Sequence, residues 1–204
     1  MLEKNYIMAI DQGTTGTRVI FVDHDGMVVS SAYKEIKQIY PEPGWVEHDP
    51  HEYWETTLIC AKEAMKKAGI TPSQVAGIGI TDQRETTIIW DKETGEPVYN
   101  AIVWQCRRTA PICEDLKARG LEEKIREKTG LTIDAYFSAT KIKWIMENVP
   151  GVKEGMKAGK LIMGCIDSWL MWKLSGGHTH VTDYSNASRQ CFMTFVNWTG
   201  IRNS

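Results

Sequence analysis

The residues best suited to chemistry lie near the N-terminus, between two apolar runs at residues 7–10 and 19–22. They are an aspartate, two glycines, two threonines and an arginine: Asp11, Gly13, Thr14, Thr15, Gly16 and Arg18. Glycines let backbone N–H groups approach an anion, and threonine hydroxyls and a guanidinium add further donors. A carboxylate beside phosphates can hold Mg²⁺, directly or through water. The segment predicts a phosphate cradle with Asp11 as its metal residue, although an ordinary hairpin with a polar tip fits the same short pattern.

Polar and aromatic side chains also follow two later apolar runs. Arg84 and Glu85 come after the run at residues 75–81, and Trp104 ends the run at residues 101–104. The first run follows a predicted helix, so we expect it to be a parallel, buried strand. Ligands gather at the carboxyl ends of strands in α/β sheets, which makes these loops binding candidates. Taken alone, Arg84 and Glu85 also fit a surface pair, and Trp104 also fits a core residue.

The first of these motifs belongs to a predicted meander that is followed by a helix. Strands are expected at residues 7–10, 19–22 and 27–30. The helix is expected over residues 51–68, with Asp49 as its N-cap, Pro50 at its first position and Gly69 as its stop. Helical spacing predicts one buried apolar face, formed by Tyr53, Trp54, Leu58, Ala61, Ala64, Met65 and Ala68.

The later chain is predicted to be mainly helical. Strands are expected at residues 87–90 and 161–165, and helices at 109–119, 121–128, 138–148 and 167–174. His178 and His180 resemble a metal-binding pair, but a zinc site needs three or four ligands and no carboxylate or thiol follows at ligand spacing. We therefore expect an exposed turn there.

Composition narrows the class of protein. The chain has 204 residues, 42% of them hydrophobic and 25% charged, which is typical of a soluble globular protein. A net charge of −2 gives no electrostatic case for a nucleic-acid partner. The sequence has neither the apolar core of a signal peptide nor a run long enough for a membrane span, and five cysteines without a CxxC pair fit free thiols. A cytoplasmic protein is expected.

Several motifs together resemble the FGGY carbohydrate kinases, and the glycerol kinases among them. The matching segments are residues 11–18, 43–50, 79–87, 99–110, 136–148 and 182–189. The resemblance implies an α/β fold of the RNase H-like type shared by actin, sugar kinases and Hsp70, with helices on both faces of a mixed sheet. It also implies transfer of the ATP γ-phosphate to the 3-hydroxyl of glycerol, with ATP and Mg²⁺ as cofactors.

The resemblance assigns a role to each matching residue. Asp11 would serve Mg²⁺, and Arg18 would neutralise charge that develops on the phosphate. The nucleotide phosphates would bind Thr14, Thr15 and Gly16, glycerol hydroxyls would bind Arg84, Glu85 and Tyr136, and Trp104 would pack on the glycerol carbons. Arginine only donates and ionised glutamate only accepts, so the pair can fix the hydroxyls of a triol. Two positions depart from the family, because Gly16 stands where serine is common and Ala135 where proline is usual.

Length is the largest departure. Family members have two comparable domains and are much longer than 204 residues. We therefore expect residues 1–204 to be an N-terminal domain, truncated at its C-terminal end and without the second, nucleotide-binding domain. The family's catalytic base would lie beyond the chain end, so the isolated chain is expected to be inactive. The alternatives are part of another FGGY sugar or polyol kinase, or a non-catalytic remnant, and association with a second copy or with a C-terminal half is expected to be one consequence of an uncovered face.

Overall fold

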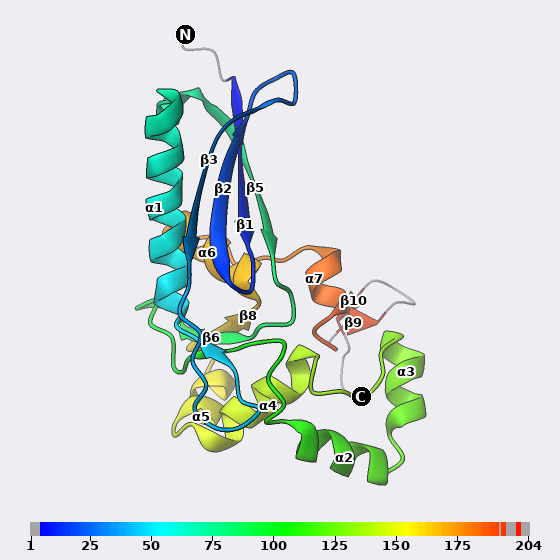
Figure 1. Cartoon of the computed structure of the whole chain (residues 1–204). Helices are drawn as coiled ribbons and strands as arrows, with labels where there is room; N and C mark the ends of the chain where they lie inside the picture. The colour runs from blue at the N-terminus through cyan, green and yellow to red at the C-terminus, as the bar shows by residue number, and fades with distance from the viewer. Residues whose placement is uncertain (1–4, 192, 195–198, 201–204) are drawn as a thin grey trace. The chain divides into compact units, whose positions relative to one another are not determined.

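The computed structural model describes residues 5–191, 193–194 and 199–200 (Figure 1). Contacts within the chain group into two compact units. The first, which we call the sheet unit, comprises Met1–Gln38 and Asp49–Gln83. The second, the helical unit, comprises Ile39–His48 and Arg84–Ser204.

The sheet unit contains a four-stranded mixed sheet in the order β3-β2-β1-β5. Its strands are β1 (Tyr6–Gln12), β2 (Gly16–Val22), β3 (Val28–Glu35) and β5 (Val75–Asp82). The first three pair antiparallel, and β5 runs parallel to β1. The predicted meander is confirmed, although β3 continues five residues past its expected end at residue 30.

Helix α1 (Pro50–Ala68) packs on β2 and β3 within this unit (Figure 1). The Asp49 side chain accepts a hydrogen bond from the His51 backbone N–H, and Gly69 ends the helix with a φ of 66°. The predicted apolar face is only partly correct. Tyr53 and Ala64 are buried, but Trp54 is half-buried and Ala68 is exposed.

The buried stripe of α1 includes two threonines and a cysteine that the apolar pattern omitted. Thr56, Thr57 and Cys60 are each at most 1% exposed. Thr56 and Thr57 can be buried because their hydroxyls donate to the carbonyl oxygens of Glu52 and Tyr53, each at 2.7 Å. A scan for hydrophobic residues alone does not detect buried threonines whose hydroxyls are hydrogen-bonded within their own helix.

Strand residues alternate between the two faces of the sheet. Five side chains fill the face toward α1: Met8, Ile10, Val19, Phe21 and Ala32. The predicted parallel strand at residues 75–81 is confirmed as β5, but its expected burial is wrong, because β5 is an edge strand and Ile78 is 49% exposed. The physical reason is that α1 lies over β2 and β3.

The helical unit combines short strand pairs with helices. Its strands are β4 (Glu47–His48), β6 (Ile88–Asp91), β7 (Ala101–Ile102), β8 (Leu161–Gly164), β9 (Met193–Thr194) and β10 (Thr199–Gly200), which pair as β4-β7, β6-β8 and β9-β10. Its helices are α2 (Ala110–Ala118), α3 (Glu122–Thr129), α4 (Ser138–Asn148), α5 (Val152–Lys157), α6 (Ile166–Leu174) and α7 (Tyr184–Ser188). Four of these helices and strands β6 and β8 were predicted within one or two residues, whereas α5 and α7 were not anticipated. None of the described helices is long and apolar enough to span a membrane.

A buried ion pair links the strand pair β4-β7 to the chain that leaves it. The Arg108 guanidinium lies 2.6 Å from Glu47 Oε1 and 3.9 Å from the centre of the Trp45 ring. The Tyr99 hydroxyl and the Asn100 amide donate to the same carboxylate at 2.8 and 2.7 Å. Because the buried charges are paired and hydrogen-bonded, the cluster can lie in the core at a tolerable desolvation cost. It fixes the chain just before and after Trp104.

Candidate functional site

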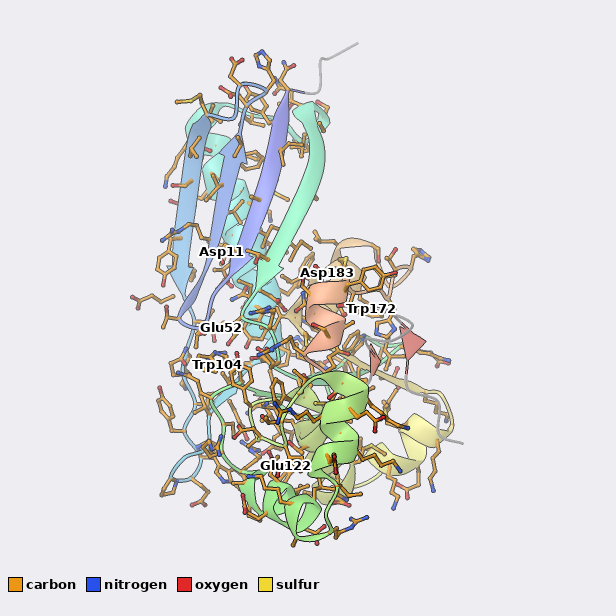
Figure 2. The ribbon with its side chains drawn as sticks, turned by 90° about the vertical axis from the view of Figure 1, so that its right-hand side faces the viewer. Asp11, Glu52, Trp104, Glu122, Trp172 and Asp183 are labelled. Atoms are coloured by element: carbon orange, nitrogen blue, oxygen red, sulfur yellow. The ribbon has the colours of Figure 1, made fainter. Side chains whose placement is uncertain are left out.

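The predicted phosphate residues form the tip of the β1-β2 hairpin. The Gly13 N–H donates to the Gly16 carbonyl at 3.0 Å, which closes a tight turn around Thr14 and Thr15. Asp11 pairs with Arg18 in the antiparallel register, so both side chains lie on one face of the sheet. Figure 2 labels Asp11 at this end of β1. The structure thus brings the aspartate, the arginine and the turn together.

One row of the face that carries Asp11 consists of exposed polar side chains. Register places Thr81, Asp11, Arg18 and Tyr33 in one row across the four strands. All four are exposed, and this is the face opposite the side chains packed on α1. The row offers a carboxylate for a metal ion beside a guanidinium for an anion.

Side-chain hydrogen bonds support the hairpin. Thr17 Oγ1 donates to Gln12 Oε1 at 2.7 Å and lies 2.6 Å from Thr56 Oγ1 on α1. Gln38 Nε2 donates to the Thr14 carbonyl at 2.9 Å. These supporting residues were not predicted from the sequence. Their only sequence signal is that Gln12 and Thr17 are polar and stand next to the site residues along the strands. These contacts order the turn before any ligand arrives.

The second group of predicted residues lies in the helical unit and begins at a strained turn. Arg84 and Glu85 have φ values of 31° and 55°, in a region that residues with a side chain seldom adopt. The Thr86 N–H donates to the Arg84 carbonyl at 2.6 Å. The turn leaves Arg84 exposed and buries Glu85 to 1% exposure. Such strain occurs often at binding sites, where surrounding contacts hold it in place.

Arg189 is the partner of the buried Glu85 carboxylate. Its Nε donates to Glu85 Oε1 at 2.7 Å. The guanidinium also lies 5.5 Å from the Tyr136 ring centre and 4.9 Å from that of Phe137. Burial opposes its charge, but the hydrogen bonds to Glu85 and Tyr136 raise the pKa of Arg189 above its ordinary value. Arg189 was not predicted as a site residue, and the only signal was its place in the matching segment 182–189.

Tyr136 and Trp104 form an aromatic pair. Their ring centres are 5.5 Å apart in an edge-to-face arrangement, and both side chains are partly exposed. Arg189 connects this pair to Glu85, because its guanidinium contacts the Tyr136 ring and donates to the Glu85 carboxylate. The structure thus brings Glu85, Trp104 and Tyr136 together with Arg84 at the adjoining position of the turn.

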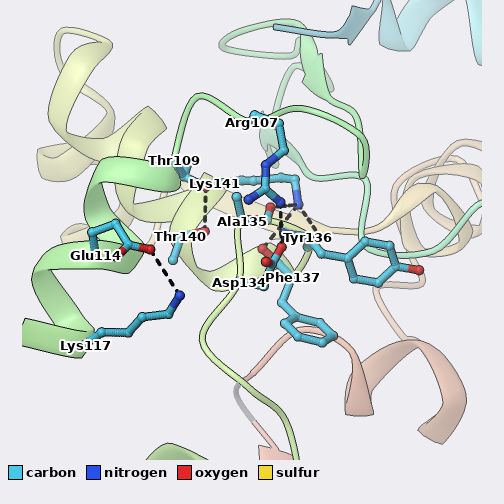
Figure 3. A network of polar contacts seen from close by, with 10 residues as sticks. All are labelled: Arg107, Thr109, Glu114, Lys117, Asp134, Ala135, Tyr136, Phe137, Thr140 and Lys141. Carbon is cyan, nitrogen blue, oxygen red and sulfur yellow. Dashed lines mark hydrogen bonds and ion pairs between the residues drawn. The ribbon is translucent and has the colours of Figure 1, made fainter. Parts of the chain in front are cut away.

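Lys141 and Asp134 hold the loop that presents Tyr136 (Figure 3). Lys141 is fully buried, and its Nζ donates to the carbonyl oxygens of Ala135, Tyr136 and Phe137. Asp134 Oδ1 accepts from the Tyr136 N–H at 2.8 Å. Burial lowers the pKa of Lys141 to about 8. The loop is therefore fixed by polar contacts even though alanine stands at position 135.

Residues 6–198 match the N-terminal domain of the FGGY family of carbohydrate kinases. The chain belongs to this family. It is 62% identical over 184 residues to the glycerol kinase of Caldanaerobacter subterraneus subsp. tengcongensis, covering 90% of this chain and 37% of that protein. It is 63% identical over 184 residues to glycerol kinase 2 of Thermotoga maritima, with the same coverage. The chain therefore spans about 37% of the length of these FGGY relatives.

Solved structures support the fold of the FGGY family. The Plasmodium falciparum glycerol kinase with ADP is 36% identical, with a TM-score of 0.91, and the match covers 98% of this chain and 40% of that chain. The xylulose kinase from Rhodospirillum rubrum has a TM-score of 0.84 at 23% identity, covering 96% of this chain and 39% of its own; at that identity the match shows the fold alone. The predicted fold class, a sugar-kinase α/β fold with a mixed sheet, is confirmed.

Two other features of this FGGY chain do not join the site. A cavity of about 350 Å³ lies among α2, α3 and α4, and none of the predicted site residues lines it. His180 Nε2 lies 2.9 Å from the Met163 carbonyl, and its ring packs edge-on against Trp90. Across residues 5–191 and the described strands beyond them, no group of three metal-ligating side chains occurs. His178 and His180 are both exposed, as predicted.

Proposed function

We propose that this chain is the N-terminal, substrate-binding part of a glycerol kinase, which transfers the γ-phosphate of ATP to the 3-hydroxyl of glycerol. The observation that carries the proposal is the group in which Arg189 contacts Glu85 and Tyr136 and the Tyr136 ring packs on Trp104, in a chain 62% identical to glycerol kinases. More distant sugar kinases share the fold, but they match at lower identity.

The chemistry of the group suits a short polyol. Ionised Glu85 accepts hydrogen bonds from hydroxyl groups, and Arg84 donates to them. The Tyr136 hydroxyl supplies a further contact, and the indole of Trp104 offers an apolar face to the C–H side of the triol. A site whose buried polar groups each need a hydroxyl discriminates against analogues that lack one.

The hairpin in the sheet unit would bind the phosphates of ATP. Thr14, Thr15 and Gly16 provide hydroxyl and backbone donors, and Arg18 adds positive charge. The exposed carboxylate of Asp11 is a suitable donor for Mg²⁺, which commonly takes only one or two carboxylates in nucleotide sites. The metal ion would supply charge neutralisation at the phosphates. Phosphoryl transfer depends mainly on positioning and charge stabilisation, and these residues could provide both.

Calorimetric titration of the purified chain with glycerol tests this proposal. We expect binding that Arg84→Ala weakens at least tenfold, because Arg84 is the expected hydroxyl donor. Arg119→Ala is the matched control, since Arg119 is an exposed arginine paired with Asp115 on α2. Xylulose, offered in parallel, should bind less well. Absence of glycerol binding, or preference for the ketose, would contradict the proposal.

A further inference from the structure

The volume beside Gly16 is occupied by a tyrosine from the neighbouring strand. A Cβ atom at residue 16 would lie 2.5 Å from the Tyr33 hydroxyl oxygen and 2.6 Å from Cζ. It would also lie 2.6 Å from the Lys34 carbonyl oxygen. Heavy atoms cannot approach so closely without displacement, so residue 16 must be glycine while Tyr33 holds this position. The phenol therefore reaches the point where a side chain of the phosphate loop would begin.

The sheet register explains why Tyr33 points there. Tyr33 on β3 pairs with Arg18 on β2, and cross-strand partners share a face. The Arg18 guanidinium lies 5.6 Å from the centre of the Tyr33 ring. This cation–π contact holds the ring beside Arg18, while 47% of the residue stays exposed. Arg18 is thus held between Tyr33 and the Asp11 side of the row.

The position of the phenol gives it a chemical role. The loop presents hydroxyl donors at Thr14 and Thr15 and a charge at Arg18, but Gly16 has no side chain to contribute. A phenolic O–H is a donor to phosphate oxygen, and a hydrogen bond to an ionised acceptor is stronger than a neutral one. The hydroxyl lies at the loop, on the same face as Arg18 and Asp11.

We propose that Tyr33 is a phosphate-binding residue, whose hydroxyl donates to a polyphosphate oxygen and supplies the contact that Gly16 cannot make. This inference rests on the proposed function, since it assumes that the hairpin binds the phosphates of a nucleotide. It adds a phosphate-binding residue on β3, a strand outside the loop motif. The alternative is that Tyr33 only packs on Arg18, in which case its hydroxyl has no binding role.

The test is titration of the chain with magnesium tripolyphosphate, which carries the phosphate chemistry without the nucleoside. Tyr33→Phe removes the hydroxyl and keeps the ring over Gly16 and Arg18. We expect about tenfold weaker binding, as for loss of one hydrogen bond to a charged group. Thermal unfolding should be unchanged, because the residue is half exposed. Tyr40→Phe, which removes a hydroxyl from a residue that is 67% exposed, is the matched control.

Arg18→Ala distinguishes the phosphate role of the hairpin from that of the Tyr33 hydroxyl. If Arg18→Ala abolishes binding while Tyr33→Phe binds like the unaltered chain, Tyr33 only packs on Arg18 and the inference is wrong, although the hairpin still binds phosphate. If the unaltered chain does not bind tripolyphosphate, the phosphate role of the hairpin fails and that of Tyr33 fails with it. Glycerol titration is independent of both results, so failure of the proposed substrate is recognised separately.

Discussion

At the scale of single residues, the buried Glu85 side chain depends on its ion pair with Arg189. Its side chain is 1% exposed, and Arg189 Nε lies 2.7 Å from its Oε1 atom. A buried carboxylate without a partner would take up a proton or force the turn to rearrange. A protonated carboxyl would present a donor, whereas the proposed polyol contact of Glu85 needs an acceptor. Arg189 therefore pairs with the buried Glu85 side chain and fixes its orientation, which makes it a positioning residue for the proposed polyol site.

Replacement of this partner should weaken both the fold and the site. Breaking a buried pair costs about 3–5 kcal/mol, and because the Arg189 side chain is 30% exposed we expect Arg189→Ala to lower the free energy of unfolding by about 2 kcal/mol. Glycerol binding should be lost at the same time. Urea unfolding measures the first effect and calorimetry the second. Arg119→Ala, which removes an exposed arginine, should change stability by less than about 0.5 kcal/mol. Equal losses in the two variants would show that Glu85 does not depend on Arg189.

At the scale of elements, α4 holds the loop before it through Lys141. A lysine near a helix N-terminus is unfavourable for the helix dipole, but its Nζ reaches back to the carbonyl oxygens of residues 135–137. Phe137 occupies the N-cap position without a side-chain hydrogen bond, so the contacts of Lys141 hold the entry to the helix in the absence of a capping side chain. The helix thus fixes the backbone that presents Tyr136.

The burial of Lys141 predicts a specific pH dependence. Its pKa falls from 10.5 to about 8 in the folded chain. Between these values the unfolded chain binds a proton that the folded chain does not, so stability rises with pH in this window. From pH 7 to 9.5 we expect unaltered chain to gain about 2 kcal/mol in unfolding free energy relative to Lys141→Met. Denaturant unfolding at both pH values measures this difference.

The matched variant for that experiment is on the same helix. Lys143 is half exposed and forms an ion pair with Glu147, one turn along α4. Lys143→Met should leave the pH dependence in this window as it is in the unaltered chain. If Lys141→Met and Lys143→Met give the same profile, Lys141 is charged in the folded chain up to its ordinary pKa, and the three carbonyl oxygens offset its burial.

The elements also show which parts of the structure can be predicted from sequence. The meander and the ends of α1 were predictable because their signals are local, such as the cap at Asp49 and the stop at Gly69. The edge position of β5 was not, because it depends on which strands α1 covers. The motif residues Glu85 and Tyr136 could be identified by resemblance, but the partner of Glu85 is 104 positions away in the chain. A buried pair such as Glu85 and Arg189, whose members are far apart in the chain, produces no periodic pattern in the sequence.

At the scale of the whole molecule, the two candidate binding groups belong to different compact units. Asp11 and Arg18 lie in the sheet unit, whereas Glu85, Trp104 and Tyr136 lie in the helical unit. The chain passes from one unit to the other between Gln83 and Arg84, directly at the strained turn. Each group is supported by hydrogen bonds within its own unit, so each should bind its ligand without the other.

This separation predicts two independent patterns of protection in hydrogen–deuterium exchange. Ligand binding stabilises the state that binds and slows local opening around the site. Glycerol should therefore protect amides near residues 84–86 and 134–138, and magnesium tripolyphosphate should protect the β1-β2 hairpin. Arg84→Ala should abolish only the first pattern and Arg18→Ala only the second. If either variant removed both patterns, the two groups would not bind their ligands independently, and this prediction would be wrong.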